Sequence, residues 1–253
     1  MVLVMSDYFI FDTETDGHNP QGLIQLSVAT NKGKAHFDKY IKPTKPMFPA
    51  AIAVHGIPDC DLEKEDNEEE VYNYIVKNLV KSKKIFVAQN GTFDVDVVNT
   101  FLYRCKGESF HDGKDHNFCP RLVDTLTIAR KFIDRKEIGN HKLDTLFIYL
   151  FPDRVKELFE RRMTHDALED CLITNEVLLE LGERYLGTQD IEKMFKKMGD
   201  PLKPKIIETW PVGKYKGKPL SVAKSDSGYL KWVGENLTSR RDLIFSLKEK
   251  GII

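Results

Sequence analysis

Apolar residues divide the chain into a strand-rich beginning and a helix-rich remainder. Three apolar segments near the start, residues 7–13, 23–30 and 34–42, are rich in Ile, Phe, Val and Tyr and are separated by glycines, which predicts three strands. Because their connections are short, we expect these strands to pair in antiparallel fashion. Residues 84–90 form a further short apolar run between polar residues and predict a buried strand.

Apolar residues recur at helical spacing through most of the following chain. This spacing predicts helices over residues 71–82, 92–104, 124–133, 142–150 and 166–181. Three strands followed by strands that alternate with helices indicate an α/β domain, in which helices cover a mixed sheet.

The pattern breaks up after Gly182, and the composition changes there as well. Residues 193–218 contain eight lysines against two acidic residues, with glycines and prolines scattered among them. We therefore expect a first domain over residues 1–186, a linker over 187–207 and a small C-terminal α+β module over 208–253.

The overall composition is that of an ordinary soluble globular protein. Of the 253 residues, 41% are hydrophobic and 30% are charged, and the formal net charge of −1 gives no indication of a nucleic-acid partner. The four cysteines lack C-x-x-C and zinc-ligand spacings, which indicates reduced thiols in a reducing compartment. The apolar start MVLVMS is too short for a signal peptide or a membrane span, so we expect a cytoplasmic protein without a membrane partner.

Two acidic residues end the first apolar segment. Asp12 and Glu14 are two positions apart, and residues at this spacing project from the same face of a strand. Two carboxylates at close range repel each other, and a divalent cation such as Mg²⁺ or Mn²⁺ would neutralise them. The alternative is that an acid here only caps the turn that follows, as Asp16 before Gly17 could do.

Two further segments offer groups for the same chemistry. Asp94 follows a predicted buried strand and opens a helix, although an acid in a first turn often only interacts favourably with the helix dipole. His165 and Asp170 are five residues apart, which separates their side chains by about 140° on a regular helix. They can face one site only if His165 precedes the helix, and the capping residues Thr164 and Asp166 place the helix start there.

Together these segments offer four carboxylates and one imidazole, the set that a two-metal phosphodiester hydrolase needs. In such an enzyme two cations about 4 Å apart bind the attacking water and the leaving 3′-oxygen. An imidazole that titrates near neutral pH takes the proton from that water. Each residue type in the set therefore has a role in this reaction.

Three segments resemble the three motifs of the DnaQ-like, DEDD-type 3′→5′ exonucleases. DTET at residues 12–15 resembles the first motif, QNGTFD at 89–94 the second and HDALEDC at 165–171 the third. Histidine five residues before the last aspartate resembles the DEDDh branch, and Gln89 stands where the family usually has histidine. The stretch VGKYKGKPLSVAKSDSGYLKWVGENL resembles the small module that follows the nuclease domain in the exodeoxyribonuclease X enzymes.

The resemblance implies a ribonuclease H-like fold, with a mixed five-stranded sheet flanked by helices. It implies that Asp12, Glu14, Asp94 and Asp170 hold two Mg²⁺ ions, for which Mn²⁺ can substitute, and that His165 is the general base. The implied reaction is hydrolysis of phosphodiester bonds at DNA 3′ ends, single-stranded or frayed, which releases nucleoside 5′-monophosphates. A 3′→5′ exoribonuclease of the same superfamily, a proofreading-type subunit and a catalytically silent nucleic-acid-binding module remain alternatives.

Other residues are candidates for substrate contact or for structural roles. The loop after the first motif is expected to approach the 3′ end, and the tail combines lysines with aromatic faces that can stack on bases. The substrate-binding candidates are Thr13, Thr15, His18, Asn90, Phe93, Lys214, Tyr215 and Lys216. Asp124 is interpreted as the cap of its helix, and Trp210, Tyr229 and Trp232 are expected to form the core of the C-terminal module.

Overall fold

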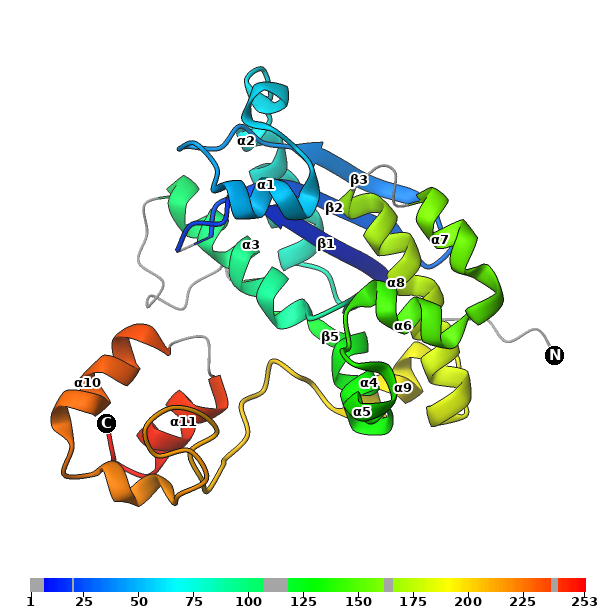
Figure 1. The fold of residues 1–253 in the computed structure, drawn as a ribbon. Coiled ribbons are helices and arrows are strands. Elements are labelled where there is room, and N and C mark those ends of the chain that lie inside the picture. Colours follow the sequence, from blue (N-terminus) through cyan, green and yellow to red (C-terminus); the bar gives the residue numbers. More distant parts are fainter. Residues whose placement is uncertain (1–6, 20, 107–117, 162–165, 238–240) are drawn as a thin grey trace. The chain divides into compact units, whose positions relative to one another are not determined.

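The computed structural model describes residues 7–19, 21–106, 118–161, 166–237 and 241–253 (Figure 1). The chain forms two compact units, Met1–Pro201 and Leu202–Ile253. The first unit contains the sheet and most of the helices, and the second is small and mainly helical.

The first unit is built on one mixed sheet, to which the described residues contribute five strands. These are β1 (Phe9–Thr15), β2 (Leu23–Thr30), β3 (Ala35–Tyr40), β4 (Ile85–Ala88) and β5 (Arg121–Asp124), in the spatial order β3-β2-β1-β4-β5. β2 is antiparallel to both β1 and β3, whereas β1, β4 and β5 are parallel to one another. The predicted mixed sheet is confirmed, and β1 is its central strand.

Helices flank this sheet, and none of the described ones is long and apolar enough to cross a membrane (Figure 1). The helices of the first unit are α1 (Pro49–His55), α2 (Glu68–Tyr74), α3 (Gly91–Lys106), α4 (Thr125–Phe132), α5 (Arg135–Ile138), α6 (Leu143–Leu150), α7 (Val155–Arg161), α8 (Ala167–Leu181) and α9 (Ile191–Met198).

Side chains of β1 alternate between the two faces of the sheet. Tyr8, just before the strand, and Ile10 are buried in a core that they share with residues of α4, α6 and α8. Phe11 points the other way and packs against aromatic rings that include one from β4. Because successive side chains of a strand point to opposite faces, Asp12 follows Ile10 onto the α8 face and Thr13 follows Phe11 onto the α3 face.

The segment 187–207, expected to be a linker, contains helix α9. Ile191 and Met194 of this helix are fully buried and belong to the main core of the first unit. Glu192 accepts two hydrogen bonds from the guanidinium of Arg121 in β5, at 2.9 and 2.6 Å. The helix forms because its apolar residues share one face, which the edge of the sheet covers.

The second unit is organised around a buried tryptophan. Its helices are α10 (Ser227–Asn236) and α11 (Arg241–Glu249), and an isolated bridge joins Thr209 to Pro219. The expectation for Trp232 is wrong: Trp210 is 1% exposed at the centre of the unit, whereas Trp232 is 46% exposed and stacks on Tyr229. The inward face of α10 carries Leu230 and Val233, and Trp232 is turned away from it because one residue rotates a helix by about 100°.

Candidate active site

Three carboxylates meet where β1 ends beside the first turn of α8. Side-chain oxygens of Asp12, Glu14 and Asp170 all lie within 4.8 Å of one another, and the three side chains are half-buried. Hard divalent cations prefer oxygen ligands of this kind. These residues could therefore hold a divalent cation, which would offset the repulsion among the three carboxylates.

The first turn of α8 is anchored to the sheet, and this fixes Asp170. Asp166 caps the helix by accepting a hydrogen bond from the backbone N of Leu168 (3.1 Å), which confirms the predicted helix start. Gln25 of β2 is fully buried and donates from Nε2 to Oδ1 of Asp166 (2.7 Å). β2 therefore holds the start of α8 one turn before Asp170.

Asp94 approaches β1 from the opposite face of the sheet. It lies in the first turn of α3 and is only 3% exposed. Thr13 donates to Oδ1 of Asp94 from its backbone N (3.2 Å) and from Oγ1 (2.7 Å). Burial raises the pKa of Asp94 to about 7 because the ionised carboxylate loses its hydration, and the hydrogen bond from Thr13 opposes this rise. Asp94 is not one of the described carboxylates that lie within 4.8 Å of one another. It is linked to them through the hydrogen bond from Thr13, which lies between Asp12 and Glu14 in β1.

Asp124 connects the end of β5 to the turn between β4 and α3. Its Oδ1 accepts hydrogen bonds from the backbone N of Leu126 and of Asn90, both at 2.9 Å, and Thr127 Oγ1 donates to Oδ2 (3.0 Å). Burial raises the pKa of Asp124, and these hydrogen bonds counteract the rise. Its predicted function as the cap of α4 is confirmed, and the bond to Asn90 is an additional one that the sequence did not indicate.

A family model described as RNase_T exonuclease matches residues 9–178, a range that contains the carboxylate group and Asp94. The chain belongs to this exonuclease family. It is therefore a nuclease, as its three motifs predict.

Known relatives agree with this assignment. Exodeoxyribonuclease 10 of Escherichia coli strain K12 is 28% identical over 237 residues, which cover 91% of each chain. The epsilon subunit of DNA polymerase III from the same strain is 27% identical over 190 residues, which cover 71% of this exonuclease and 72% of the subunit. The crystal structure of Escherichia coli exonuclease I in complex with a dA16 oligonucleotide covers 76% of this chain and 42% of its own, with a TM-score of 0.52 at 17% identity, and shares the fold.

The histidine of the third motif lies outside the described residues of the exonuclease. His165 and Thr164 both belong to the segment 162–165, whose placement the structure does not describe. The described part of the motif begins at Asp166, directly after His165, and contains Asp170.

The loop after the first motif is held together by Asp16. Its Oδ1 accepts hydrogen bonds from the backbone N of His18 (2.9 Å) and of Gly22 (2.8 Å). His18 Nε2 donates to the carbonyl oxygen of Pro46 (2.9 Å), and its ring lies on Phe48 with 4.4 Å between centroids. A Cβ at Gly22 would lie 2.2 Å from Asp16 Oδ2, so a larger residue there would displace this carboxylate.

The remaining substrate-binding candidates of the first unit lie near the same edge of the sheet. Thr15 ends β1, where the register with β2 shifts. Phe93 is in the first turn of α3 and is 38% exposed, and Asn90 precedes that helix with a left-handed φ of 68°. These positions suit contact with a substrate, and Thr13 also bonds directly to Asp94, a carboxylate that could bind metal.

The candidates in the second unit surround Asp226, the cap of α10. Lys214 Nζ (2.7 Å) and Tyr215 Oη (2.8 Å) both donate to Asp226 Oδ2, and Tyr229 N donates to Oδ1 (3.1 Å). Hydrogen bonds from Lys214 and Tyr215 lower the pKa of Asp226 to about 2. Lys214 and Tyr215 thus fasten the glycine-rich loop to α10, whereas Lys216 is exposed.

Proposed function

We propose that the protein is a metal-dependent 3′→5′ exodeoxyribonuclease. The proposal rests on the carboxylate group of Asp12, Glu14 and Asp170, with Asp94 joined to it through Thr13, in a chain of the exonuclease family. Hydrolysis of the terminal phosphodiester bond would release nucleoside 5′-monophosphates one at a time. The 3′→5′ direction is supported by the resemblance of the three segments to the DEDDh motifs.

The proposed cofactor is Mg²⁺, bound as two ions, for which Mn²⁺ can substitute. Asp12, Glu14 and Asp170 would bind the ions from the α8 face, and Asp94 would complete the ligand set from the α3 face. Bound Mg²⁺ supplies Lewis-acid activation and neutralises charge on the phosphate. The donor set fits this role, because half-buried carboxylates within 4.8 Å of one another are unfavourable without a cation.

We assign the general base to His165. An imidazole titrates near neutral pH and can accept the proton of the water that attacks the phosphorus. The assignment is supported by the position of His165 directly before Asp166, the cap of α8, and five residues before Asp170. Two side chains five residues apart within a regular helix would point about 140° away from each other. A residue that precedes the helix is not subject to this separation.

The proposed substrate is DNA with a single-stranded or frayed 3′ end. The chemistry acts on phosphate and does not read the 2′-hydroxyl group, so the carboxylates alone do not select DNA over RNA. The choice of DNA is supported by the relatives, an exodeoxyribonuclease that matches over 91% of each chain and a DNA polymerase subunit.

The test uses oligodeoxynucleotides labelled at the 5′ or the 3′ end, and an RNA of the same sequence. With Mg²⁺ we expect the 3′ label to be released first, as a mononucleotide, and the 5′-labelled strand to shorten stepwise. EDTA and the variant Asp170→Asn should both abolish this activity, and His165→Ala should reduce it strongly while leaving stabilisation by Mg²⁺ intact. Release of the 5′ label first, activity in EDTA or faster cleavage of RNA would each contradict one part of the proposal.

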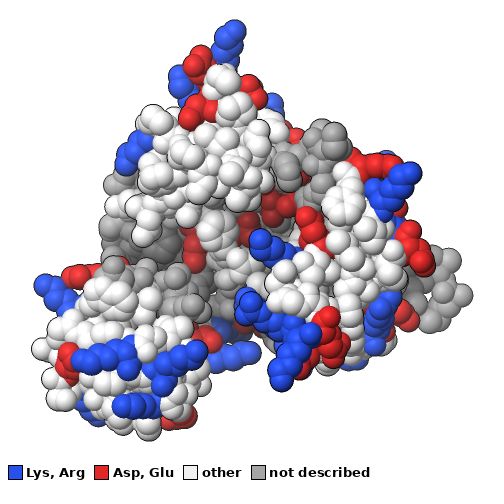
Figure 2. Space-filling view, viewed as in Figure 1, with Lys and Arg blue, Asp and Glu red and all other residues white. Residues whose placement is uncertain are grey.

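We also propose that the second unit increases affinity for DNA without taking part in hydrolysis. Figure 2 shows lysine and arginine side chains gathered on the visible face of this unit. Lys216, Lys218 and Lys224 are exposed and form no ion pair with a described residue. Deletion of residues 202–253 should weaken DNA binding. The logarithm of the binding constant should also fall less steeply with the logarithm of the salt concentration, by about 0.7 in slope for each phosphate of a single strand that the unit neutralises. Unchanged binding would contradict this role.

A further inference from the structure

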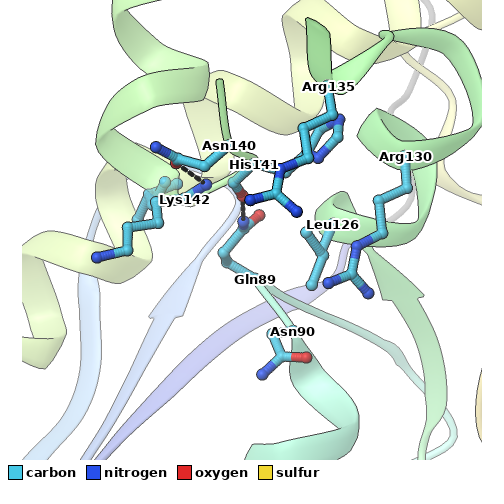
Figure 3. Close-up of a pocket in the computed structure, with 9 residues that line it drawn as sticks. Gln89, Asn90, Leu126, Arg130, Arg135, Asn140, His141 and Lys142 are labelled. Atoms are coloured by element: carbon cyan, nitrogen blue, oxygen red, sulfur yellow. Dashed lines mark hydrogen bonds between the residues drawn. The ribbon is translucent and has the colours of Figure 1, made fainter. Parts of the chain in front are cut away.

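The first unit contains a basic pocket that the proposed reaction does not use. It has a volume of about 540 Å³ and lies between the turn after β4 and helices α4, α5 and α6 (Figure 3). The polar side chains that line it include Gln89, Asn90, Arg130, Arg135, Asn140 and Lys142.

Three cationic side chains reach this pocket from three different elements. Arg130 comes from α4, Arg135 from α5 and Lys142 from the residue before α6. All three are exposed, and none forms an ion pair with a carboxylate in the described part of the chain. Arg135 Nε donates to the carbonyl oxygen of Gly139 (3.0 Å), which orients the guanidinium and leaves its two Nη groups for another acceptor. Like charges that gather in this way repel one another, and a bound anion would offset that repulsion.

The centre of the pocket is held in place by Gln89. Its Nε2 donates to the carbonyl oxygen of His141 (2.8 Å), and its Oε1 accepts a hydrogen bond from Thr125 Oγ1. Gln89 therefore ties the turn after β4 to both α4 and the segment before α6. Figure 3 shows the guanidinium groups of Arg130 and Arg135 to one side of Gln89 and the ammonium group of Lys142 to the other.

Two asparagines add further hydrogen-bond donors to the pocket. The carbonyl oxygen of the Asn140 side chain accepts from Lys142 N and Thr145 Oγ1, both at 2.9 Å, so its NH₂ group is available for another partner. Asn90 has a left-handed φ of 68°, held by the bond from its N to Asp124 Oδ1 (2.9 Å). Left-handed residues other than glycine are uncommon, and such conformations cluster at functional sites.

The pocket and the carboxylate group lie at the same edge of the sheet. β1 and β4 are parallel neighbours, with Ile10 opposite Val87, and neighbouring strands are about 5 Å apart. Asp12 stands near the carboxyl end of β1, and Gln89 directly follows β4. Figure 2 shows acidic side chains within a hollow of the first unit and basic side chains on the surface beside it. Open α/β sheets bind their ligands at the carboxyl ends of their strands, so one ligand can contact both the pocket and the carboxylate group.

We propose that this pocket binds a phosphate group, either an internal phosphodiester of the bound strand or the phosphate of the released nucleotide. The inference rests on the proposed function, because it assumes a polynucleotide substrate. Each guanidinium offers paired N–H donors that match two phosphate oxygens, and the asparagine amides add donors. With a formal net charge of −1, the chain has to attract a polyanion through local groups such as these. The pocket would also offset repulsion between the phosphate backbone and the carboxylates beside it.

The test compares two double variants that remove the same charge from the same helices. Arg130→Gln/Arg135→Gln removes both guanidinium groups from the pocket, and Lys131→Gln/Lys136→Gln is the matched control at exposed neighbouring positions that do not line it. Binding of a fluorescent oligodeoxynucleotide is measured by anisotropy in EDTA over a series of salt concentrations. Inhibition by a deoxynucleoside 5′-monophosphate is measured in parallel with Mg²⁺, together with kcat and KM.

If the pocket holds the strand, we expect the arginine variant to bind the oligonucleotide about tenfold more weakly, with KM raised and kcat little changed. The slope of the logarithm of the binding constant against the logarithm of the salt concentration should become shallower by about 0.7 for each phosphate that the variant no longer neutralises. The slope of the lysine control should stay near that of wild type. If the pocket holds the released nucleotide, only inhibition by the monophosphate weakens. Equal behaviour of the two double variants in both assays would overturn the inference. Wild-type protein that fails to degrade DNA would overturn the proposed function, while anisotropy of the two double variants would still show whether the pocket binds the strand.

Discussion

Thr13 donates two hydrogen bonds to Asp94, from its backbone N at 3.2 Å and from Oγ1 at 2.7 Å. Thr13 stands between Asp12 and Glu14, whose side chains belong to the carboxylate group on the other face of β1. A single stretch of strand therefore sets the position of acids on both of its faces. The threonine of the first motif is thus part of the site through its hydroxyl group as well as its backbone.

Thr13→Val should weaken metal binding while it preserves the shape of the side chain. The buried carboxylate of Asp94 loses one of its two donors from this residue, a loss of about 1–3 kcal/mol. We expect the Mg²⁺ concentration for half-maximal activity to rise about tenfold, and Thr13→Ser, which retains the hydroxyl, to restore it. Thr30→Val, at the end of the neighbouring strand β2 and outside the candidate site residues, is the matched control. Unchanged Mg²⁺ dependence in Thr13→Val would show that the hydroxyl does not position Asp94.

Asp170→Asn should abolish activity and yet stabilise the protein in EDTA. Loss of one ligand should reduce the rate at least about hundredfold, because a bound metal contributes several kcal/mol and about 1.4 kcal/mol corresponds to tenfold. Without metal, the variant has less repulsion within the carboxylate group, and a gain of about 1 kcal/mol would raise Tm by roughly 2–4 °C. Addition of Mg²⁺ should raise the Tm of wild type and leave that of the variant unchanged.

The matched control for this experiment is Asp153→Asn, which removes an exposed acid outside the carboxylate group. It should retain both the activity and the stabilisation by Mg²⁺. A lower Tm of Asp170→Asn in EDTA would mean that hydrogen bonds of Asp170 stabilise the fold more than its charge destabilises it.

The second unit should lose stability in acid as Asp226 becomes protonated. Its folded-state pKa of about 2 lies below the ordinary value of 3.8, so its ionised form stabilises the fold above about pH 4. This contribution disappears as the pH falls from about 4 to about 2. Both tryptophans of the chain, Trp210 and Trp232, are in this unit, so the thermal unfolding of the unit can be followed by tryptophan fluorescence. Asp226→Asn should show a smaller decline in Tm over this interval than wild type or the control Glu235→Gln.

Trp210→Ala and Trp232→Ala should differ greatly in their effect on the second unit. Trp210 is 1% exposed and its Nε1 donates to the carbonyl oxygen of Leu220, so its removal should destabilise the unit by about 3–5 kcal/mol. Trp232 is 46% exposed, and its removal should cost about 1 kcal/mol or less. Urea unfolding followed through the remaining tryptophan measures both values. Equal losses would contradict the structural assignment of the core.

Relations between neighbours in the chain could be predicted from the sequence. The two-residue alternation of a strand placed Asp12 and Glu14 on one face, and capping rules placed the start of α8 at Asp166 and that of α4 at Asp124. These predictions succeeded because a strand or a helix end is determined by a few consecutive residues. The motif spacing likewise placed Asp170 within the first turn of α8.

Relations between distant segments were decided only by the tertiary structure. The bond from Thr13 to Asp94 spans 81 positions and that from Gln25 to Asp166 spans 141, and no local pattern specifies either partner. The exclusion of Trp232 from the core depended on which face of α10 was covered. The sequence by itself determined which acids could share a face of β1, but it placed Arg130 only within a predicted helix and gave no sign that Arg135 lies near it. Packing of α4, α5 and the turn after β4 brought those charges to one pocket, because concavity arises only when separate elements meet.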